Sequence, residues 1–330
     1  MGDVAMTVPV LRAFSLQYPD VQLTVVSRPF FKPFFDDIEN VTFFAIDLKE
    51  RHKGFLGLLR LFSDLRKLNI DAVADLHNVL RSKVVRTLFA LSGKKVAATD
   101  KGRQDKKELT KLEAKTISPT KSMFSRHVQT FAILGFPLNL ENPTFPKSVV
   151  LSEEIIAITG KKEGNWIGIA PFAQYESKVY PIDLMQNVID ELANKNSNKI
   201  FLFGGGEEEI KKLNQLKNKH ENVLVLAGKT NLKQELAIIS NLNMMLSMDS
   251  GNAHIAAMLG VKVLTLWGAT HSFAGFKPFN QPDDFCMTSD REQFPFLPTS
   301  VYGNKKVEGY ENVMRSILPE MVVSKINSVL

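Results

Sequence analysis

The sequence predicts an α/β protein of two doubly wound domains with a cleft between them. Its 330 residues are enough for two domains with cores of their own, and 44% of them are apolar. Short apolar runs typical of buried parallel strands alternate with amphipathic helical segments, first before residue 142 and again after residue 164. Between the two series, residues 142–146 carry two prolines and indicate a linker. We therefore place one domain at 1–146 and the other at 147–330.

The first domain is predicted to begin with a helix, where a doubly wound domain normally begins with a strand. We infer that a strand is missing upstream, so that Met1 is an internal methionine of a longer protein or the chain is truncated. The charged stretch 99–122 has no clear period and is expected to be a functional or a disordered loop. The other elements alternate: helix 4–18, strand 21–27, helix 30–38, strand 41–46, helix 55–68, strand 72–76, helix 79–91, strand 95–98 and helix 123–134.

The second domain repeats the alternation after a short helix, 153–159, that Ser152 is expected to cap. Residues 269–306, rich in Pro, Phe and polar groups, are predicted to be irregular. A helix over 310–330, interrupted at Pro319, closes the chain, and we leave open whether it packs back on the first domain. Between these lie strands 166–170, 199–203, 223–226, 244–248 and 261–266, and helices 182–194, 207–218, 232–241 and 252–259.

Composition narrows the class of protein and its compartment. The single cysteine, Cys286, excludes an internal disulfide and a cysteine-based metal site, which fits a reducing compartment. No window holds 18 consecutive apolar residues, and the first residues lack the layout of a signal peptide. We therefore expect a cytoplasmic protein.

Positive charge is concentrated in one segment. The formal net charge is +6, and residues 94–126 hold ten Lys or Arg against four Asp or Glu. Such a segment suits an anionic membrane face or an acidic substrate, and the alternative is a solvated loop with excess lysine. Nucleic acid is the weakest option, because no helix-turn-helix, zinc finger or aromatic RNA-binding signature accompanies the charge.

The stretch 244–268 predicts the principal ligand site. An apolar strand ends there, the turn Asp249-Ser250-Gly251 follows, and a short helix leads to the next strand. At the edge of an open parallel sheet, such a turn presents free helix N–H groups to a phosphate or a ribose. We expect Asp249 to accept from a sugar hydroxyl and His254 to donate to a phosphate. The alternatives are that Asp249 or Ser250 only caps the helix and that His254 is a packed core residue.

Two loops at other strand ends of the second domain add candidates. Lys178 lies in the loop after strand 166–170, where an ammonium group would neutralise a leaving phosphate, although most loop lysines are only solvated. Gly204 and Gly205 follow strand 199–203 and allow close backbone approach to a nucleotide. The acids at 207–209 stabilise the helix start and would repel a phosphate there, so we expect contact with the base or the ribose instead.

The first domain supplies candidates at two helix starts. His77, Arg81 and Lys83 surround the start of helix 79–91, and the two cations suit a carboxylate or phosphate on an acceptor. The alternative there is a helix cap by the neighbouring Asp75 or Asn78. Asp3 begins the first helix, from which its carboxylate would project into the cleft as a general base; on a fraying chain end it would do nothing.

Metal ligands are not arranged at any recognisable spacing. The sequence has no HExxH motif, no His/Asp/Glu cluster at ligand spacing and no DxD pair. We therefore predict neither a tightly held metal nor another cofactor.

Segments typical of one known family run along nearly the whole chain, in the family's order: GDVAMTVPVLRAF at 2–14, DLHNVLRS at 75–82, KVYP at 178–181, FGGGEEE at 203–209 and DSGNAHIAAMLGVKVLTLWGAT at 249–270. They resemble the heptosyltransferase family, which includes the ADP-heptose:lipopolysaccharide heptosyltransferases. The resemblance implies two Rossmann-like domains in the GT-B arrangement, the first binding an acceptor and the second a nucleotide-sugar. It also implies an inverting, metal-independent sugar transfer to an acceptor of the lipid A–core oligosaccharide type.

The resemblance also assigns roles to residues. Asp3 resembles the acidic residue that takes the acceptor's proton, and Lys178 resembles the lysine that contacts the phosphate. The group Asp249, Ser250, Gly251 and His254 resembles the contacts to the donor diphosphate and sugar.

ADP-heptose is then the favoured donor, and the protein is expected on the cytoplasmic face of the inner membrane, with residues 94–126 toward the anionic surface. The chain departs from the family in its missing first strand, in its basic stretch 100–122 and in Tyr180, where a tryptophan is common.

Two other functions stay open at this point. A nucleotide-sugar epimerase shares the fold and would release free nucleotide without an acceptor. A non-catalytic relative that binds a sugar-nucleotide or a glycolipid would bind nucleotide without turnover.

Overall fold

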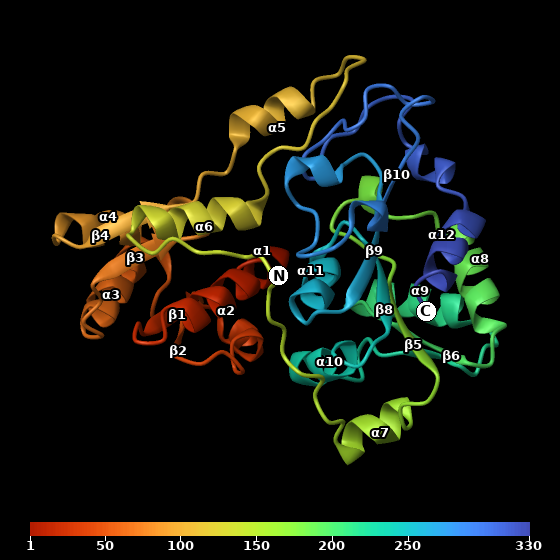
Figure 1. Ribbon diagram of the computed structural model, residues 1–330, viewed down its shortest axis with the longest axis horizontal. Helices are drawn as coiled ribbons and strands as arrows, with labels where there is room; N and C mark the ends of the chain where they lie inside the picture. Colours follow the sequence, from red (N-terminus) through yellow and green to blue (C-terminus); the bar gives the residue numbers. More distant parts are fainter. The chain divides into compact units, whose positions relative to one another are not determined.

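The computed structural model describes all 330 residues of the chain, which fold into two compact units (Figure 1). The first unit contains residues 3–102 and 121–144, together with Met1. The second contains residues 103–120 and 145–330, together with Gly2. Each unit has parallel strands with helices between them, so the predicted α/β class with two Rossmann-like domains is confirmed.

One six-stranded parallel sheet forms the frame of the second unit, with strand order β10-β9-β8-β5-β6-β7. Numbered along the chain from β5, the strands lie in the order 3-2-1-4-5-6 when read from β7, which is the Rossmann order. The order reverses between β5 and β8, so the chain leaves these two neighbours toward opposite halves of the sheet. The strands are β5 (Asn165–Ala170), β6 (Asn198–Leu202), β7 (Val223–Val225), β8 (Met244–Met248), β9 (Lys262–Trp267) and β10 (Cys286–Thr288).

Five of these strands were predicted, with ends that agree to within one residue. Their residues are almost all buried, and β8 is buried along its whole length, as expected of central parallel strands. The sixth, β10, lies in the region that was predicted to be irregular. It has three residues, too few to show any period in the sequence, and pairs with β9 at the sheet edge.

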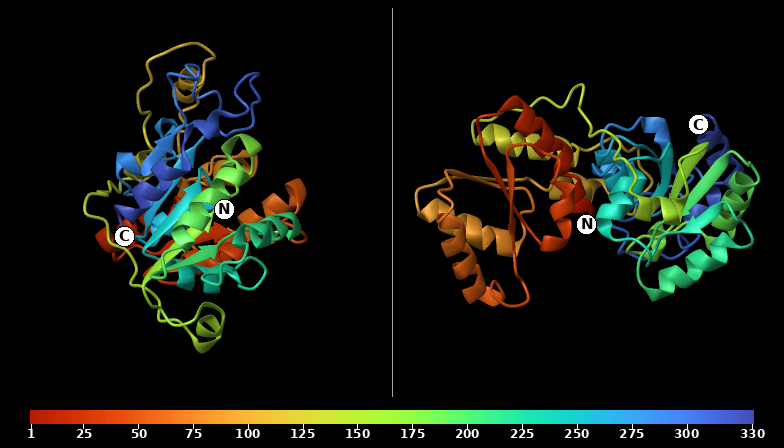
Figure 2. Two further views of the ribbon diagram at one scale, coloured as in Figure 1. Left: turned by 90° about the vertical axis from the view of Figure 1, so that its right-hand side faces the viewer. Right: turned by 90° about the horizontal axis from the view of Figure 1, so that it is seen from below.

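Helices cover both faces of this sheet: α8, α9 and α12 lie on one face, and α10 and α11 on the other (Figures 1 and 2). The closing helix begins at Pro319, later than predicted, because proline fits the first turn of a helix but not its interior. It packs on α8, within the core of the second unit. The helices are α7 (Glu153–Thr159), α8 (Ile182–Ala193), α9 (Glu207–Lys217), α10 (Leu232–Ile239), α11 (Gly251–Met258) and α12 (Pro319–Asn327).

In the first unit the strands form two separate parallel pairs rather than one continuous sheet. One pair is β1 (Leu23–Ser27) with β2 (Val41–Ala45), and the other is β3 (Ala72–Asp75) with β4 (Lys95–Ala98). Most of their residues are only partly buried, in contrast to the strands of the second unit. Helices supply much of the core here: one cluster lies between α3 (Gly54–Arg66) and α4 (Leu80–Leu91), and elsewhere the rings of Phe14 and Phe131 pack with their centres 4.9 Å apart.

The helix predicted over residues 4–18 is two helices, α1 (Gly2–Ala5) and α2 (Val8–Gln17). Pro9 is the reason, because a proline in a helix interior has no N–H to donate and clashes with the preceding turn. In the structure it occupies the first turn of α2, where no donor is needed. A 3₁₀ turn, Pro29–Phe34, replaces the next predicted helix, and α6 (Met123–Ile133) forms as predicted.

The basic stretch 94–126 does not form one surface. Residues 103–120 belong to the second unit and include a short helix, α5 (Arg103–Leu109), where a loop was predicted. Lys106 is 4% exposed, with its ammonium 4.0 Å from the centre of the Phe276 ring. Thr120 donates from its N–H and its hydroxyl to the carbonyl of Phe273, at 2.9 and 2.8 Å. At least one positive charge of this stretch, that of Lys106, is therefore buried within the second unit.

Arg126 connects the residues on either side of segment 103–120 within the first unit. It is 3% exposed; its guanidinium pairs with Asp100 before this segment and donates to the carbonyl of Lys121 after it, at 3.1 Å. Gly102 lies against it so closely that a Cβ there would be 2.1 Å from Nη2. The residues at which the chain leaves and re-enters this unit are thus fixed by one buried side chain.

None of the helices has the length and apolar character needed to cross a lipid bilayer.

We predict that Arg126→Met lowers the free energy of unfolding of the first unit by about 1–2 kcal/mol, because the hydrogen bonds of its buried guanidinium to Asp100 and to the carbonyl of Lys121 are lost. Urea unfolding followed by circular dichroism measures the change. Lys32→Met is the matched control, because its pair with Asp36 is exposed and contributes less than about 1 kcal/mol. Equal losses in the two variants would contradict this role of Arg126.

Candidate functional site

The candidate residues form two groups, one in each unit. In the second unit, Lys178 and Asp249 follow β5 and β8, the two neighbouring strands between which the sheet order reverses. In such a sheet, the loops after these strands diverge to opposite faces and leave the carboxyl edge open to a ligand. Lys178 ends a 3₁₀ turn, Glu176–Lys178, and Asp249 directly follows Met248, the last residue of β8.

Asp249 is the centre of a polar cluster that is almost fully buried. Its side chain is about one tenth exposed and meets Lys178, whose Nζ lies 3.3 Å from Oδ2. The hydroxyl of Thr270 donates to the same oxygen at 2.9 Å. Both contacts use Oδ2, so Oδ1 is the oxygen that remains to accept from a ligand hydroxyl. The cluster combines a fixed cation with an oriented carboxylate, a combination suited to the phosphate and the sugar of one ligand.

Helix α11 begins beside this cluster with its first turn uncapped. Ser250 occupies the N-cap position in an extended conformation, but its side chain makes no cap hydrogen bond and instead meets Ser247 at 3.1 Å. Asp249 is engaged by Thr270 and Lys178. Neither side chain therefore serves only as a cap, and the amide N–H groups that begin at Gly251 can face an anion. His254, 7% exposed, lies in the same first turns.

The glycine loop after β6 is partly filled by its own helix. The N–H of Gly205 donates to Oε2 of Glu209 at 2.8 Å, and a Cβ on Gly204 would lie 3.0 Å from the same oxygen. Nothing lies within 4 Å of a Cβ on Gly205 or Gly206. A carboxylate on this amide disfavours a phosphate there, and contact of Gly204 and Gly205 with a base or ribose stays a prediction.

In the first unit the structure brings together Asp3 and His77, which the sequence predicted separately. The Nε2 atom of His77 lies 3.8 Å from Oδ2 of Asp3, and both side chains are more than half exposed. Partial burial lowers the pKa of His77, and the carboxylate of Asp3 opposes that shift. Arg81 and Lys83 lie in the first turns of α4 with exposed side chains.

The turn that carries His77 is fixed by hydrogen bonds rather than by a helix cap. Asp75 accepts from the N–H of Asn78 at 2.7 Å and pairs with Arg86 at 3.0 Å. Asn78 has a φ of +45°, and its side chain donates to the carbonyl of Thr99 at 2.9 Å. The N-cap position of α4 is Val79. The proposed cap by Asp75 or Asn78 is therefore wrong, and both residues stabilise the turn.

Sequence reasoning missed several residues of these sites. Thr270 is one of them, although it follows β9 at the same sheet edge and the rule that found Asp249 applies to it equally. Arg86 and His127 gave no signal, because each lies inside a helix among residues of ordinary amphipathic spacing. His127 is 2% exposed and meets the hydroxyl of Thr99 at 3.0 Å. No group of three or more His, Cys, Asp and Glu side chains lies close enough together to hold a metal ion.

Tyr180, where the resemblance led us to expect tryptophan, is fully buried. Its hydroxyl donates to the carbonyl of Ile317 at 2.6 Å, so the residue belongs to the core of the second unit. Burial raises its pKa. Its contacts are with the protein, so the change to tyrosine bears on packing.

Comparisons of this chain with known proteins, by sequence and by structure, find similarity to heptosyltransferases. Residues 58–300 match the model of Glycosyltransferase family 9 (heptosyltransferase). Among curated proteins, the lipopolysaccharide core heptosyltransferase OpsX of Haemophilus influenzae is 25% identical over 338 residues, which cover 99% of this chain and 93% of that protein.

Two solved structures are similar along the whole chain. Heptosyltransferase WaaC of E. coli, solved with ADP, has a TM-score of 0.70 at 18% identity and covers 100% of this chain and 97% of that one. A glycosyl transferase family 9 protein from Veillonella parvula has a TM-score of 0.73 at 19% identity and covers 99% of this chain and 93% of that one. These similarities show the fold, which is of the GT-B type as predicted.

Because each unit contains a buried histidine, we predict that acid lowers the stability of both units. Burial lowers the pKa of His127 and of His271 to about 4, from the ordinary value of 6.5. The unfolded chain therefore binds more protons below pH 6.5, and stability falls as the pH drops from there toward 4. The expected loss is about 2 kcal/mol per histidine at pH 5.

Thermal unfolding at pH 7 and pH 5 measures this dependence. His127→Gln and His271→Gln should each flatten it, because glutamine does not titrate. An unchanged pH dependence in both variants would show that other groups are responsible.

Proposed function

Because the chain belongs to glycosyltransferase family 9, the heptosyltransferases, we propose that it transfers a heptose from ADP-heptose to an acceptor of the lipopolysaccharide core. The observation that supports this most is the cluster of Lys178, Asp249 and Thr270 beside the uncapped start of α11. It offers a cation, backbone N–H groups and a free carboxylate oxygen at one sheet edge. A nucleoside diphosphate sugar has the complementary groups: two phosphates and sugar hydroxyls.

In the proposed reaction, Lys178 and the first N–H groups of α11 bind the donor diphosphate. Charge develops on the leaving diphosphate as the bond to the anomeric carbon breaks, and a fixed ammonium with oriented N–H groups stabilises it. Asp249 accepts from a hydroxyl of the donor sugar. The ADP in the solved E. coli relative supports an adenine nucleotide as the donor's leaving group.

We assign the acceptor to the first unit. Asp3 takes the proton of the attacking hydroxyl, which then bonds to the anomeric carbon on the side opposite the diphosphate and inverts its configuration. The exposed carboxylate of Asp3 and its neighbour His77 support this role. His77, Arg81 and Lys83 bind acidic groups of the acceptor, and the name of the H. influenzae relative supports a lipopolysaccharide core.

We also propose that no metal ion takes part in the transfer. Lys178 already provides a positive charge at the place where the diphosphate leaves, which is the role a divalent cation would otherwise have.

A lipid-linked acceptor requires a protein that reaches the membrane surface, and we propose a peripheral place on the cytoplasmic face. The exposed lysines and arginines of residues 94–126 contribute to this contact. A second surface supports it more directly. At the start of α3, Phe55, Leu56 and Leu59 are 65%, 67% and 37% exposed, and the basic residues Lys53 and Arg60 lie beside them.

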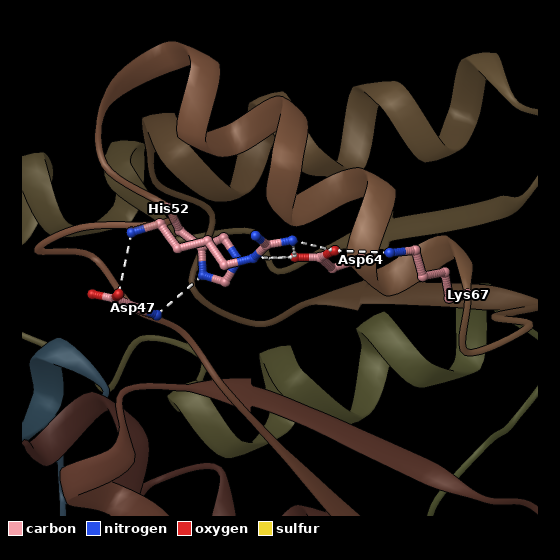
Figure 3. A network of polar contacts seen from close by, with 5 residues as sticks. Asp47, His52, Asp64 and Lys67 are labelled. Atoms are coloured by element: carbon pink, nitrogen blue, oxygen red, sulfur yellow. Dashed lines mark hydrogen bonds and ion pairs between the residues drawn. The ribbon is translucent and has the colours of Figure 1, made fainter.

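A network of polar contacts joins the loop before α3 to this helix (Figure 3). The carboxylate of Asp47 accepts from the N–H groups of residues 49, 50 and 51, and its own N–H donates to Nδ1 of His52 at 3.0 Å. Asp64 accepts from Arg51, which lowers the pKa of this carboxyl to about 2, and also meets His52 and Lys67. A Cβ on Gly57 would lie 2.2 Å from the backbone of His52, so the loop is packed tightly on the helix.

We predict that wild-type protein transfers heptose from ADP-heptose to a lipid A–core acceptor without added metal. Lys178→Ala should lower kcat by about 10²–10³-fold through loss of leaving-group stabilisation. Asp3→Asn should lower it by about 10²–10⁴-fold while leaving ADP binding intact, because it removes the base alone. A radiolabelled transfer assay and calorimetric titration with ADP measure the two effects.

Lys229→Ala and Asp20→Asn are matched controls, because both side chains are exposed and lie outside the two groups. Full turnover by Asp3→Asn would remove Asp3 as the base. Release of ADP without an acceptor in the wild type would favour an epimerase, and ADP binding without any turnover would favour a binding protein.

We predict that the protein sediments with vesicles containing phosphatidylglycerol and not with vesicles of phosphatidylcholine alone. Phe55→Ser/Leu56→Ser should weaken vesicle binding at least about tenfold, because two apolar side chains no longer enter the interface. Lys53→Glu/Arg60→Glu should weaken it by a similar factor and reduce its dependence on salt. Leu91→Ser is the control, since Leu91 is 81% exposed at the end of another helix. Equal weakening by Leu91→Ser would contradict this surface.

A further inference from the structure

Lys178 is held in place by a partly buried loop far along the chain, residues 299–304. Thr299, Ser300 and Gly303 of this loop are buried, although they lie in a stretch without regular secondary structure. The loop contacts both the turn that carries Lys178 and the backbone that follows β9. It therefore joins three segments that are distant in sequence within the second unit.

A ladder of hydrogen bonds connects these three segments. The N–H groups of Thr299 and Ser300 both donate to the carbonyl of Ala269, at 3.0 and 3.1 Å. The N–H of Ala269 donates in turn to the carbonyl of Ser177 at 3.1 Å, and the Ser177 hydroxyl donates to the carbonyl of Gly303 at 2.7 Å. Two of these bonds involve Ser177, the residue directly before Lys178, so the backbone there has little freedom to move.

Gly303 makes the closest approach to the lysine itself. A Cβ at this position would lie 2.7 Å from Cγ and 2.9 Å from Cδ of Lys178, and 3.0 Å from the hydroxyl of Ser177. Its φ of +84° is a conformation that glycine adopts without strain, and its N–H donates to the Ser300 hydroxyl at 2.9 Å. The lysine stem thus runs along bare backbone, which allows its Nζ to reach Asp249.

We propose that Gly303, with the loop 299–304, is a positioning residue that sets where the Lys178 ammonium meets the donor diphosphate. The inference rests on the proposed function, in which Lys178 stabilises the leaving diphosphate. A side chain at position 303 displaces the stem of Lys178 and draws the ammonium away from Asp249. Transition-state stabilisation falls because the charge is no longer where the leaving group develops its own.

Gly303→Ala should lower kcat for transfer on the order of 10- to 100-fold, as expected of a small displacement of a catalytic group. Gly309→Ala is the matched control: Gly309 has a similar φ of +79°, but nothing lies within 4 Å of its Cβ position. Both variants strain the backbone, and only the first meets Lys178. A loss of the same size in both would overturn the proposal.

A double-mutant cycle tests whether the effect passes through the lysine. In a Lys178→Ala background, which removes Cγ and Cδ, Gly303→Ala should lower kcat by less than about twofold further. Additive losses would mean that Gly303 acts by another route. Ser300→Ala is a second variant without added bulk; it removes the acceptor of the Gly303 N–H and should lower kcat in the same direction by a smaller factor.

A measurement that does not depend on turnover separates this inference from the proposed function. Brief labelling of the folded full chain with acetic anhydride, read by peptide mass spectrometry, reports how accessible the Lys178 amine is. Gly303→Ala should increase labelling of Lys178, and Gly309→Ala should not. If Lys178→Ala keeps full turnover, the assigned catalytic role is wrong even where labelling shows displacement. If Gly303→Ala changes neither labelling nor kcat, the positioning role is wrong.

Discussion

The parallel pairing of β5 with β8 is the constraint on which the cluster of Lys178 and Asp249, the proposed donor site, depends. Ala170 at the end of β5 lies opposite Ser247 near the end of β8, so the two strands reach the sheet edge at almost the same level. Their connections then diverge, because the strand order reverses between them. A lysine and an aspartate separated by 70 residues come within 3.3 Å of one another without any motif that contains both.

The polar groups of the two units differ in how firmly they are held. Lys178 is confined by the backbone of Gly303 and by its pair with Asp249, whereas Arg81 and Lys83 extend from the first turns of α4 into solvent. A leaving diphosphate develops its charge at one defined place, so a fixed cation suits it. A large acceptor with several acidic groups is better met by side chains that adapt to it. The difference in rigidity therefore agrees with the proposed division of labour.

Much of the second unit could be predicted because its strands are short apolar runs buried on both faces, and Asp249 could be found because it follows such a run. The first unit was less predictable: Pro9 divides the predicted first helix, and the strands form two pairs that no local pattern indicates. Gly303 and the buried Lys106 and Arg126 were beyond sequence reasoning, because their roles depend on partners such as Lys178, Phe276 and Asp100. The composition of the stretch suggests that Lys106 and Arg126 are exposed, but tertiary packing buries both.

The placement of residues 103–120 in the second unit has a consequence for modularity. Apart from Gly2, the chain passes between the units at 102/103, at 120/121 and at 144/145, so neither unit is one continuous piece of sequence. A fragment starting at residue 145 would lack the segment that covers Phe276 and bonds to the carbonyl of Phe273. Exchange of the linker-to-C-terminus part between relatives would therefore combine residues 145–330 of one protein with the segment 103–120 of another. A single junction in the sequence therefore cannot separate the two units.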